Sequence, residues 1–481
     1  MAGMIHAASD GALDVSGPGE KVNMAFVLGI VAVATIGGFM FGYDSGVING
    51  TQQGLEQAFG LSKLGTGVNV GAILLGCAAG AFAAGRLADV FGRRSVMIVA
   101  AGLFIVSALA AGAAGSSAVF IVARFIGGLG VGAASVLAPV YISEVTPASI
   151  RGRLSSLQQI MIITGLTAAF VVNYLLSKWA GGSTAVLAGH PAWRWMFWVQ
   201  VIPAGVFLVS LLGIPESPRF LVAKGREQHA HDVLARLLGK DAAPHKVAQI
   251  RNSLARDHHR PKLSDLFDKA SGKIRPIVWV GLGLAVFQQF VGINIVFYYG
   301  AVLWQSVGFS ENDALLINIL SGALSILACF AAVGLIDKIG RKPLLLIGSA
   351  GMTVTLGLVA FAFSTASMVG GQVHLAHAMG LLALISANAY VVAFNLSWGP
   401  VMWVMLGEMF PNQIRGSGLA VAGLAQWLAN FLITFSFPVM QSSLGLTVTY
   451  GFYALSALVS LLFVRSLVHE TRGRELEEMV G

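Results

Sequence analysis

Charged residues are scarce in this chain. Asp, Glu, Lys and Arg make up 11% of its 481 residues, whereas 56% are hydrophobic and the mean hydropathy is +0.78. An average soluble domain has about a quarter of its residues charged, so this chain cannot cover a soluble surface. Crossing a bilayer takes about 20 apolar residues, and we identify twelve such runs, centred on 24–50, 66–84, 95–115, 117–140, 157–177, 193–213, 276–302, 314–336, 343–365, 379–406, 417–437 and 448–468.

Cysteine and processing signals are also nearly absent. Cys77 and Cys329 are the only two cysteines, and each lies inside a predicted span, so we expect no disulfide framework. Residues 1–22 contain no apolar core beside a cleavage site, so we expect no cleaved signal peptide. No metal-ligand cluster, nucleophile beside a base or phosphate loop is present, and we therefore expect no metal, no cofactor and no enzymatic activity. The glycines from Gly127 to Gly132 follow no strand, which favours helix contact over a nucleotide loop.

The net charge of +8 has a one-sided distribution. If the amino terminus is cytoplasmic, 26 of the 30 Lys and Arg residues lie on the inner side of the membrane. The positive-inside rule then places both termini in the cytoplasm. We therefore expect the basic excess to reflect membrane topology, and we expect a lipid bilayer rather than nucleic acid as its partner.

One long polar stretch divides the spans six and six. We expect an all-α membrane protein with twelve transmembrane helices in two six-helix halves. Its predicted parts are a cytoplasmic leader, an N-terminal half, a cytoplasmic helical linker, a C-terminal half and a cytoplasmic tail, at 1–22, 23–214, 215–275, 276–468 and 469–481.

Two charged signatures recur across the linker. Asp89 and Arg93 follow span 2 as Asp337 and Arg341 follow span 8, and the Glu144 signature returns at Glu408; the offsets are 248 and 264 residues. Parallel repeats of this kind build transporters with a substrate site near the membrane midplane. These charges are either ordinary positive-inside flanks or, as we favour, salt bridges that close the inner side of an outward-facing state. The candidate gate residues are Asp89, Arg93, Glu144, Arg151, Glu216, Arg219, Asp337, Arg341, Glu408 and Arg415.

Only two charges lie deep within the predicted spans. Asp44 in span 1 and Arg124 in span 4 are at similar depth and of opposite sign. A movable Arg124 could switch Asp44 between proton-holding and proton-free forms, as proton coupling requires. The alternative is a permanent ion pair that only joins the two spans.

Amides and aromatic residues are concentrated in a few apolar spans. Amides donate and accept hydrogen bonds without charge, and indole faces suit the apolar side of a sugar ring, so together they predict a cavity for a neutral polyhydroxylated ligand. Any single glutamine could instead form an interhelical hydrogen bond. The set comprises Gln159, Gln288, Gln289, Asn294, Tyr298, Tyr299, Trp398, Trp403, Gln426 and Trp427.

Across nearly its whole length the sequence resembles the sugar porter family of the major facilitator superfamily, which includes bacterial proton–sugar symporters and animal facilitative glucose transporters. The motifs that carry the resemblance are Phe41 to Asp44, Gly85 to Arg94, Glu144 to Gly152, Pro215 to Arg219, Gln288 to Asn294, Asp337 to Arg341, Trp398 to Trp403, and Gln426 with Trp427. The resemblance implies the major facilitator fold and a multi-pass protein of the bacterial inner membrane.

The resemblance also implies roles for individual residues. Asp44 with Arg124 matches the proton-coupling pair of the bacterial symporters, and because animal facilitators lack that acid, symport is favoured. The implied sugar-binding residues are Gln159, Gln288, Gln289, Asn294, Gly399, Trp403, Gln426 and Trp427, bordered by Tyr298 and Phe41. Departures from the family pattern are Ser325, Leu166, Asn395 and the segment from His469 to Gly473.

We therefore expect a monomer that takes up a monosaccharide with a proton by alternating access. The expected substrate is a hexose such as glucose or galactose, or else xylose. The alternatives are an uncoupled sugar facilitator, a polyol or cyclitol carrier, and a sugar sensor that does not transport.

Overall fold

The computed structural model describes residues 22–146, 148–256, 263–267, 272–369, 372–411 and 414–472. Within these ranges it leaves undescribed the side chains of 148–156, 255, 256, 263, 265, 368, 369 and 372–374. The first half contains α2 (Met24–Phe59), α3 (Lys63–Phe91), α4 (Arg93–Ala113), α5 (Ser117–Val145), α6 (Ala148–Ala180), α7 (Ala192–Val199) and α8 (Val201–Gly213). The second contains α12 (Pro276–Phe290), α13 (Ile293–Ser306), α14 (Glu311–Ile339), α15 (Arg341–Ser364), α16 (His377–Leu396), α17 (Trp398–Met409) and α18 (Arg415–Leu467).

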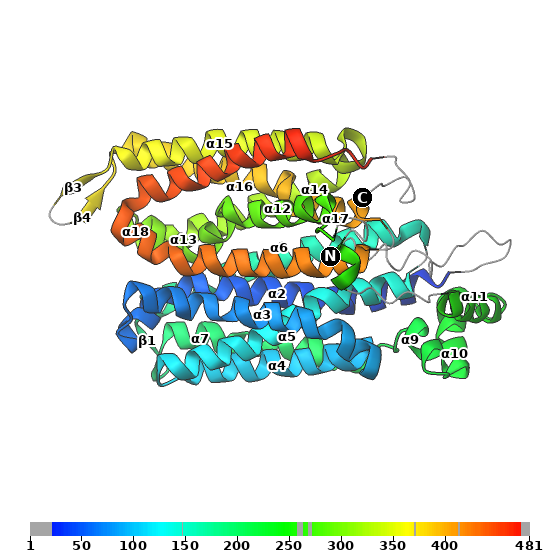
Figure 1. The fold of residues 1–481 in the computed structure, drawn as a ribbon. Helices are drawn as coiled ribbons and strands as arrows, with labels where there is room; N and C mark the ends of the chain where they lie inside the picture. Colours follow the sequence, from blue (N-terminus) through cyan, green and yellow to red (C-terminus); the bar gives the residue numbers. More distant parts are fainter. Residues whose placement is uncertain are drawn as a thin grey trace.

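Short elements mark the two ends of the molecule. The linker forms α9 (Pro218–Ala223), α10 (Glu227–Leu238), α11 (Ala243–Arg256) and the 3-10 helix η2 (Leu263–Leu266). At the opposite end lie two antiparallel hairpins, β1 (Val186–Leu187) with β2 (His190–Pro191), and β3 (Ser367–Val369) with β4 (Gln372–His374). We call these the linker end and the hairpin end (Figure 1).

The twelve predicted spans are confirmed. Within the described residues, eleven helices are long and apolar enough to cross a membrane, and the last of these, α18, holds 53 residues. Gly445 breaks α18 with a φ of 80° and a ψ of 166°, and the two parts of the helix run in opposite directions (Figure 1). The chain therefore crosses twelve times.

Spans 7 and 10 are not continuous helices, unlike the uninterrupted runs that the sequence predicts. Gly292, with a φ of 82°, separates α12 from α13, and Ser397 separates α16 from α17. A positive φ is readily available only to glycine, so Gly292 permits the first break. Broken helices in transporters place backbone groups beside the substrate site.

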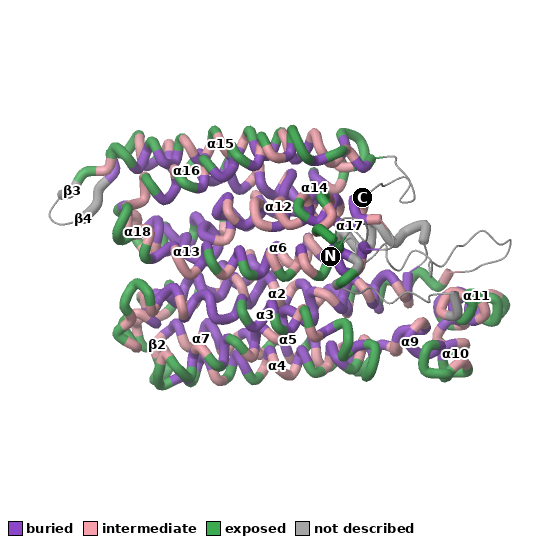
Figure 2. Tube along the Cα trace, in the orientation of Figure 1, coloured by how far each residue is buried: buried purple, intermediate pink, exposed green. Residues whose placement is uncertain are grey.

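The two halves meet along three pairs of helices. α2 packs on α13, α3 on α18, and α6 on α14. In Figure 1 α2, α3, α4, α5 and α7 lie on one side of this interface and α12 to α18 on the other. Figure 2 shows buried chain concentrated along the interface. Large apolar side chains such as Val99 and Leu327 are exposed, as a lipid-facing surface requires.

Glycine allows the closest helix contacts. Gly38, Gly42, Gly46, Gly50 and Gly54 recur every fourth residue along α2, and a Cβ at any of these five would collide with α6 or, at Gly54, with Trp193 of α7. A Cβ on Gly128 or Gly132 of α5 would overlap a backbone carbonyl oxygen of α3. The predicted helix-contact role of the glycine-rich run is thus confirmed.

Candidate functional site

A cavity of about 720 Å³ lies between the halves. All ten residues that the family resemblance implies for sugar binding line it: Phe41, Gln159, Gln288, Gln289, Asn294, Tyr298, Gly399, Trp403, Gln426 and Trp427. Tyr299 and Trp398, which the sequence analysis also assigned to a ligand cavity, are buried and do not line this one. The ten lining residues come from α2, α6, α12, α13, α17 and α18, which lie far apart in sequence. Eight of the ten belong to the second half, and six of these eight lie on its broken spans 7 and 10.

A chain of amides follows the break in span 7. Gln288 Nε2 donates to the Trp398 carbonyl oxygen at 3.0 Å, Gln289 Nε2 donates to Gln288 Oε1 at 3.2 Å, and Asn294 Nδ2 donates to Gln289 Oε1 at 2.6 Å. These bonds hold the amides in fixed orientations across α12, α13 and α17. Preoriented donors and acceptors of this kind suit a neutral hydroxylated ligand.

Aromatic rings border the cavity from both halves. The rings of Phe41 on α2 and Trp427 on α18 lie 5.6 Å apart, and their planes are inclined by 52°. This contact bridges the halves beside the amides. An aromatic wall next to fixed amides combines an apolar surface with polar contacts.

The sequence analysis missed several residues of the cavity wall, among them Ser45 and Asn430. Each lies four residues after an identified residue on the same helix, Ser45 after Phe41 and Asn430 after Gln426, so helical periodicity could have found them. Both lie near the Tyr298 side chain.

Three of the positions that depart from the family pattern lie at this cavity or behind it. Leu166 and Asn395 line it. Ser325 is fully buried, and its Oγ accepts a hydrogen bond from Asn395 Nδ2 at 3.1 Å. Ser325 thus supports Asn395 from behind.

The cavity reaches the surface at the linker end. Arg86 and Asp89 near the end of α3 and Gly416 at the start of α18 belong to its wall, and the Asp89 side chain is 72% exposed. A ligand can therefore enter or leave from that end.

Neutral hydrogen bonds join the halves at the hairpin end. Asn49 Nδ2 on α2 donates to the Phe297 carbonyl oxygen at 2.8 Å, and Asn49 Oδ1 accepts from Asn318 Nδ2 at 2.8 Å and from Ala301 N at 3.2 Å. Gln52 Nε2 donates to the Tyr298 carbonyl oxygen. We call Asn49, Gln52 and Asn318 with these partners the amide clamp; the sequence analysis did not identify it.

Asp44 and Arg124 form a buried ion pair. Arg124 Nη1 donates to Asp44 Oδ1 at 2.7 Å, and Nη2 donates to the Asp44 carbonyl oxygen at 3.1 Å. Gln200, between α7 and α8, donates its Nε2 to Asp44 Oδ1 at 2.7 Å. Both side chains are only 1% exposed, and burying ionisable groups in a membrane is costly, so the pair is a candidate functional site.

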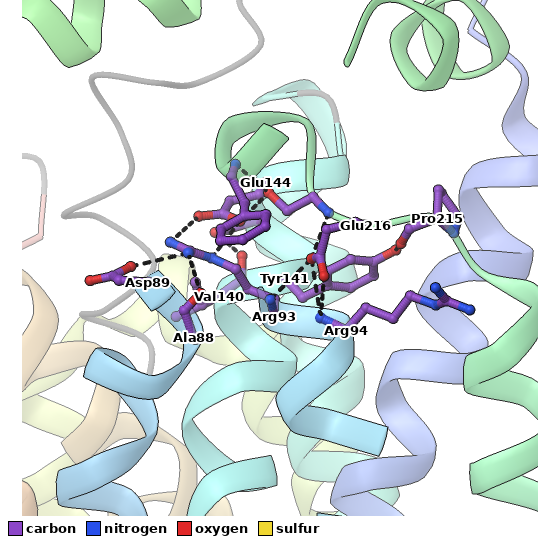
Figure 3. A network of polar contacts seen from close by, with 12 residues as sticks. Ala88, Asp89, Arg93, Arg94, Val140, Tyr141, Glu144, Pro215 and Glu216 are labelled. Atoms are coloured by element: carbon purple, nitrogen blue, oxygen red, sulfur yellow. Dashed lines mark hydrogen bonds and ion pairs between the residues drawn. The ribbon is translucent and has the colours of Figure 1, made fainter. Parts of the chain in front are cut away.

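The first recurring signature forms the N-half cluster, which comprises Asp89, Arg93, Glu144, Glu216 and Ser217 (Figure 3). Arg93 pairs with Asp89 at 3.0 Å and with Glu144 at 3.1 Å. Glu216 accepts from the backbone N of Arg93 at 3.0 Å and so caps α4, and Ser217 Oγ donates to Glu144.

The second signature forms an equivalent C-half cluster, which comprises Asp337, Arg341, Glu408, Glu470 and Thr471. Arg341 pairs with Asp337 at 3.0 Å and with Glu408 at 2.8 Å, while Thr471 Oγ1 donates to Glu408 at 2.6 Å. Glu470 caps α15 through the backbone N of Arg341 at 3.1 Å. The two clusters repeat each other contact for contact, including Glu470 and Thr471, which the sequence analysis did not assign.

Glu470 is bound by several backbone N–H groups. Partial burial raises the pKa of its carboxyl, but hydrogen bonds from the N–H groups of Arg472, Arg341, Lys342 and Thr471 outweigh burial, so the pKa lies below its ordinary value. Glu470 is therefore ionised near neutral pH.

The ion pairs and side-chain bonds described for both clusters join helices of the same half. They are present while the cavity is open at the linker end, so in this state they fix each half internally. Among the other candidate gate residues, Arg415 Nε donates to the Phe410 carbonyl oxygen at 3.2 Å, and Arg219 lies in the first turn of α9. The side chain of Arg151 lies outside the described residues.

Twelve apolar helices in two related halves, with a polar cavity that opens at one end, define a membrane transporter rather than an enzyme. The match to a family model described as "Sugar (and other) transporter" extends over residues 30–480. The chain belongs to this sugar transporter family of the major facilitator superfamily.

Individual relatives are similar over almost their full length. A glucose transport protein of Synechocystis sp. is 48% identical over 467 residues, which cover 96% of this chain and 99% of the relative. A D-xylose-proton symporter of Escherichia coli is 37% identical over 491 residues, which cover 95% of this chain and 96% of the relative.

Solved structures agree with the fold. The inward-open xylose transporter of E. coli superimposes with a TM-score of 0.80 at 36% identity, covering 94% of this chain and 99% of that one. The proton:xylose symporter bound to 6-bromo-6-deoxy-D-glucose superimposes with a TM-score of 0.75 at 35% identity, covering 95% of this chain and 99% of that one.

Proposed function

We propose that this protein carries a monosaccharide together with a proton by alternating access. The observation that carries the proposal is the cavity between the halves, whose wall combines fixed neutral amides with aromatic rings. A neutral hydroxylated ring matches this wall, because an anionic ligand would need more cations than the cavity offers.

The proposed substrate is a hexose such as glucose or galactose, with xylose as the pentose alternative. Similarity to a glucose transport protein and to D-xylose-proton symporters supports this choice of sugars. Gln159, Gln288, Gln289, Asn294 and Gln426 would bind the hydroxyl groups. The rings of Trp403 and Trp427 would pack against the apolar face of the sugar.

We place the linker end and both termini in the cytoplasm, in a monomer that crosses the bacterial inner membrane. The excess of Lys and Arg at that end supports this orientation. The structure would then be inward-facing, with the amide clamp closed toward the outside. The higher TM-score to the inward-open relative is in line with this assignment.

Proton coupling would act through Asp44. In the outward-facing state Asp44 takes a proton, loses its negative charge and holds Arg124 less tightly, which frees α2 and α5 to move as the cavity closes over the sugar. After inward opening the sugar leaves first and the proton second. With one positive charge carried per cycle, the membrane potential supplies about 2.3 kcal/mol per 100 mV.

The test is uptake of labelled glucose, galactose and xylose into vesicles, with and without a proton gradient, for the wild type and Asp44→Asn. We expect gradient-driven accumulation in the wild type and only equilibration in the variant. Wild-type accumulation that persists after collapse of the gradient would refute symport. Absence of uptake for all three sugars would refute monosaccharide transport.

A further inference from the structure

Several buried polar atoms around the Asp44–Arg124 pair have no hydrogen-bond partner among the described residues. They are Asp44 Oδ2, Ser107 Oγ on α4, Arg124 Nε and Gln200 Oε1. All four side chains are at least 98% buried. Buried polar groups are nearly always satisfied, and an unsatisfied one costs about 1–3 kcal/mol, so a shared partner is expected.

Gly127 on α5 lies beside two of these atoms. A Cβ at this position would overlap Ser107 Oγ and would lie 3.9 Å from Asp44 Oδ2. The hydroxyl and the free carboxylate oxygen therefore flank the same side of Gly127. Gln200 Oε1 belongs to the amide that already contacts the other Asp44 oxygen, so it lies close by.

We propose that Asp44, Ser107 and Gln200 hold a water molecule against Gly127, and that this water delivers the transported proton to Asp44 Oδ2. Two acceptors and a hydroxyl match the two donors and two acceptors of water. The adjacent Arg124 guanidinium disfavours a metal cation at the same point. This inference rests on the proposed proton symport and adds the route by which Asp44 receives the proton.

The transfer is a simple exchange. Asp44 Oδ2 gains a proton as one O–H bond of the water breaks, while the oxygen of this water takes up the incoming proton. The water between Ser107 and Gln200 is therefore neutral before and after the transfer. The carboxyl group loses its charge, so Arg124 Nη1 loses its ionic partner. The other electrostatic partners near this pair are the Cys77 thiol on α3, which interacts with both residues, and Tyr298 on α13, which interacts with Arg124.

Tyr298 also connects this site to the cavity. It lines the cavity wall and lies near Ser45, the residue that follows Asp44 on α2. Movement of Asp44 can therefore reach the bound sugar through this neighbouring residue.

The test uses Ser107→Ala, which removes one anchor of the water, and Gly127→Ala, whose methyl group would displace the Ser107 hydroxyl from its position. Proton-driven accumulation of the transported sugar in vesicles should fall by about tenfold in each, as expected for loss of a hydrogen bond of about 1.4 kcal/mol. Exchange of labelled for unlabelled sugar across the membrane should stay within about twofold, because exchange requires no release of the proton. The pH dependence of accumulation should change as well.

Two matched controls separate coupling from packing. Ser143→Ala removes a buried hydroxyl of α5 that already donates to the Val140 carbonyl oxygen at 2.7 Å, and Gly102→Ala adds a methyl group on α4 where nothing lies within 4 Å. Both should match the wild type in accumulation, exchange and pH profile.

If Ser107→Ala and Gly127→Ala both show the accumulation and pH profile of the wild type, the proposed water site is refuted, whereas symport is not. Equal losses of exchange and accumulation in folded Ser107→Ala would assign Ser107 a purely structural role and overturn it too. A wild type that accumulates sugar with a sodium gradient instead of a proton gradient would refute the proposed symport itself.

Discussion

Asn49 and Asn318 are joined by a buried hydrogen bond of 2.8 Å although 269 residues separate them, and this bond connects the two halves at the hairpin end. Every contact of the amide clamp involves neutral groups. Closure at this end therefore needs no charge separation, and salt should have little effect on it. In an alternating-access cycle these bonds must break each time the outer side opens.

Asn49→Ala should favour the outward-open state. It removes three hydrogen bonds between the halves, and bonds within membranes contribute about 0.6 kcal/mol each on average, so the equilibrium should shift by roughly tenfold or more. The measurement is labelling of Ser45→Cys, in the cavity wall, by a membrane-impermeant thiol reagent added outside. Thr51→Ala is the control, because the Thr51 hydroxyl donates to the Ile48 carbonyl oxygen of the same helix. Equal labelling of Ser45→Cys in the Asn49→Ala and Thr51→Ala proteins would contradict a role of Asn49 as a clamp.

Gln158 and Gln159 offer a matched pair of adjacent amides. Gln159 lines the cavity, whereas Gln158 is buried against Gly38 of α2. Gln159→Ala should weaken sugar binding by about 3–10-fold, as loss of one neutral hydrogen bond predicts. Gln158→Ala should leave the Kd unchanged. Binding measured by calorimetry on purified protein decides; an equal effect of the two changes would argue against a sugar contact at Gln159.

The two carboxylates that pair with Arg341 should differ in importance. Glu408 is 18% exposed and accepts hydrogen bonds from Arg341 and Thr471, whereas Asp337 is 79% exposed and makes one ion pair. Glu408→Gln should lower stability by about 1–3 kcal/mol, because it weakens charge-assisted bonds. Asp337→Asn should have little effect, since exposed ion pairs contribute at most about 1 kcal/mol. Thermal unfolding in detergent measures both, and a larger loss for Asp337→Asn would refute this ranking.

Glu470 predicts a pH dependence of stability. Burial raises the pKa of its carboxyl group, but hydrogen bonds from four backbone N–H groups lower this pKa by a larger amount. The folded-state pKa therefore lies below the ordinary 4.5. A depressed carboxyl pKa stabilises the fold above the unfolded-state pKa, and that contribution disappears as the pH falls through the folded-state pKa. The difference in Tm between wild type and Glu470→Gln should therefore be largest at neutral pH and vanish in acid. A difference in Tm that grows as the pH falls would contradict a lowered pKa for Glu470.

Gly42 should tolerate no side chain. A Cβ there would overlap the Ile162 carbonyl oxygen of α6, whereas at Gly29 on the same helix nothing lies within 4 Å. Overpacking typically costs about 1–3 kcal/mol, so Gly42→Ala should lower Tm or expression while Gly29→Ala should not. Equal thermal stability of the two variants would show that α2 and α6 can separate without cost.

The sequence predicted the twelve spans because apolar runs of bilayer length seldom occur outside membrane proteins. It also predicted which amides share a cavity, since uncharged polar side chains are conspicuous in apolar helices. The breaks at Gly292 and Ser397 were not predictable, because glycine and serine also lie within unbroken spans, as Gly42 and Ser45 do in α2. Span lengths were underestimated where polar residues extend a helix, as in α2, which continues to Phe59.

The residues that the sequence analysis missed have partners distant in sequence. Nothing in the local sequence distinguishes Gln200 from other amides, because its partner Asp44 lies 156 residues away. Asn49 stood at the edge of the predicted first span, and its partners lie on α13 and α14. Glu470 and Thr471 fall in a segment that departs from the family motif, yet their chemistry is preserved in the equivalence with Glu216 and Ser217.

The proposed proton-coupling pair and the richest wall of the cavity belong to different halves. Asp44 and Arg124 lie on α2 and α5, whereas Gln288, Gln289 and Asn294 lie on α12 and α13. After a duplication, the residues that couple transport to the proton gradient and the residues that select the sugar can thus change independently of each other. Chimeras that exchange one half with a relative would combine a new sugar preference with the existing drive, provided that the α2–α13, α3–α18 and α6–α14 contacts remain compatible.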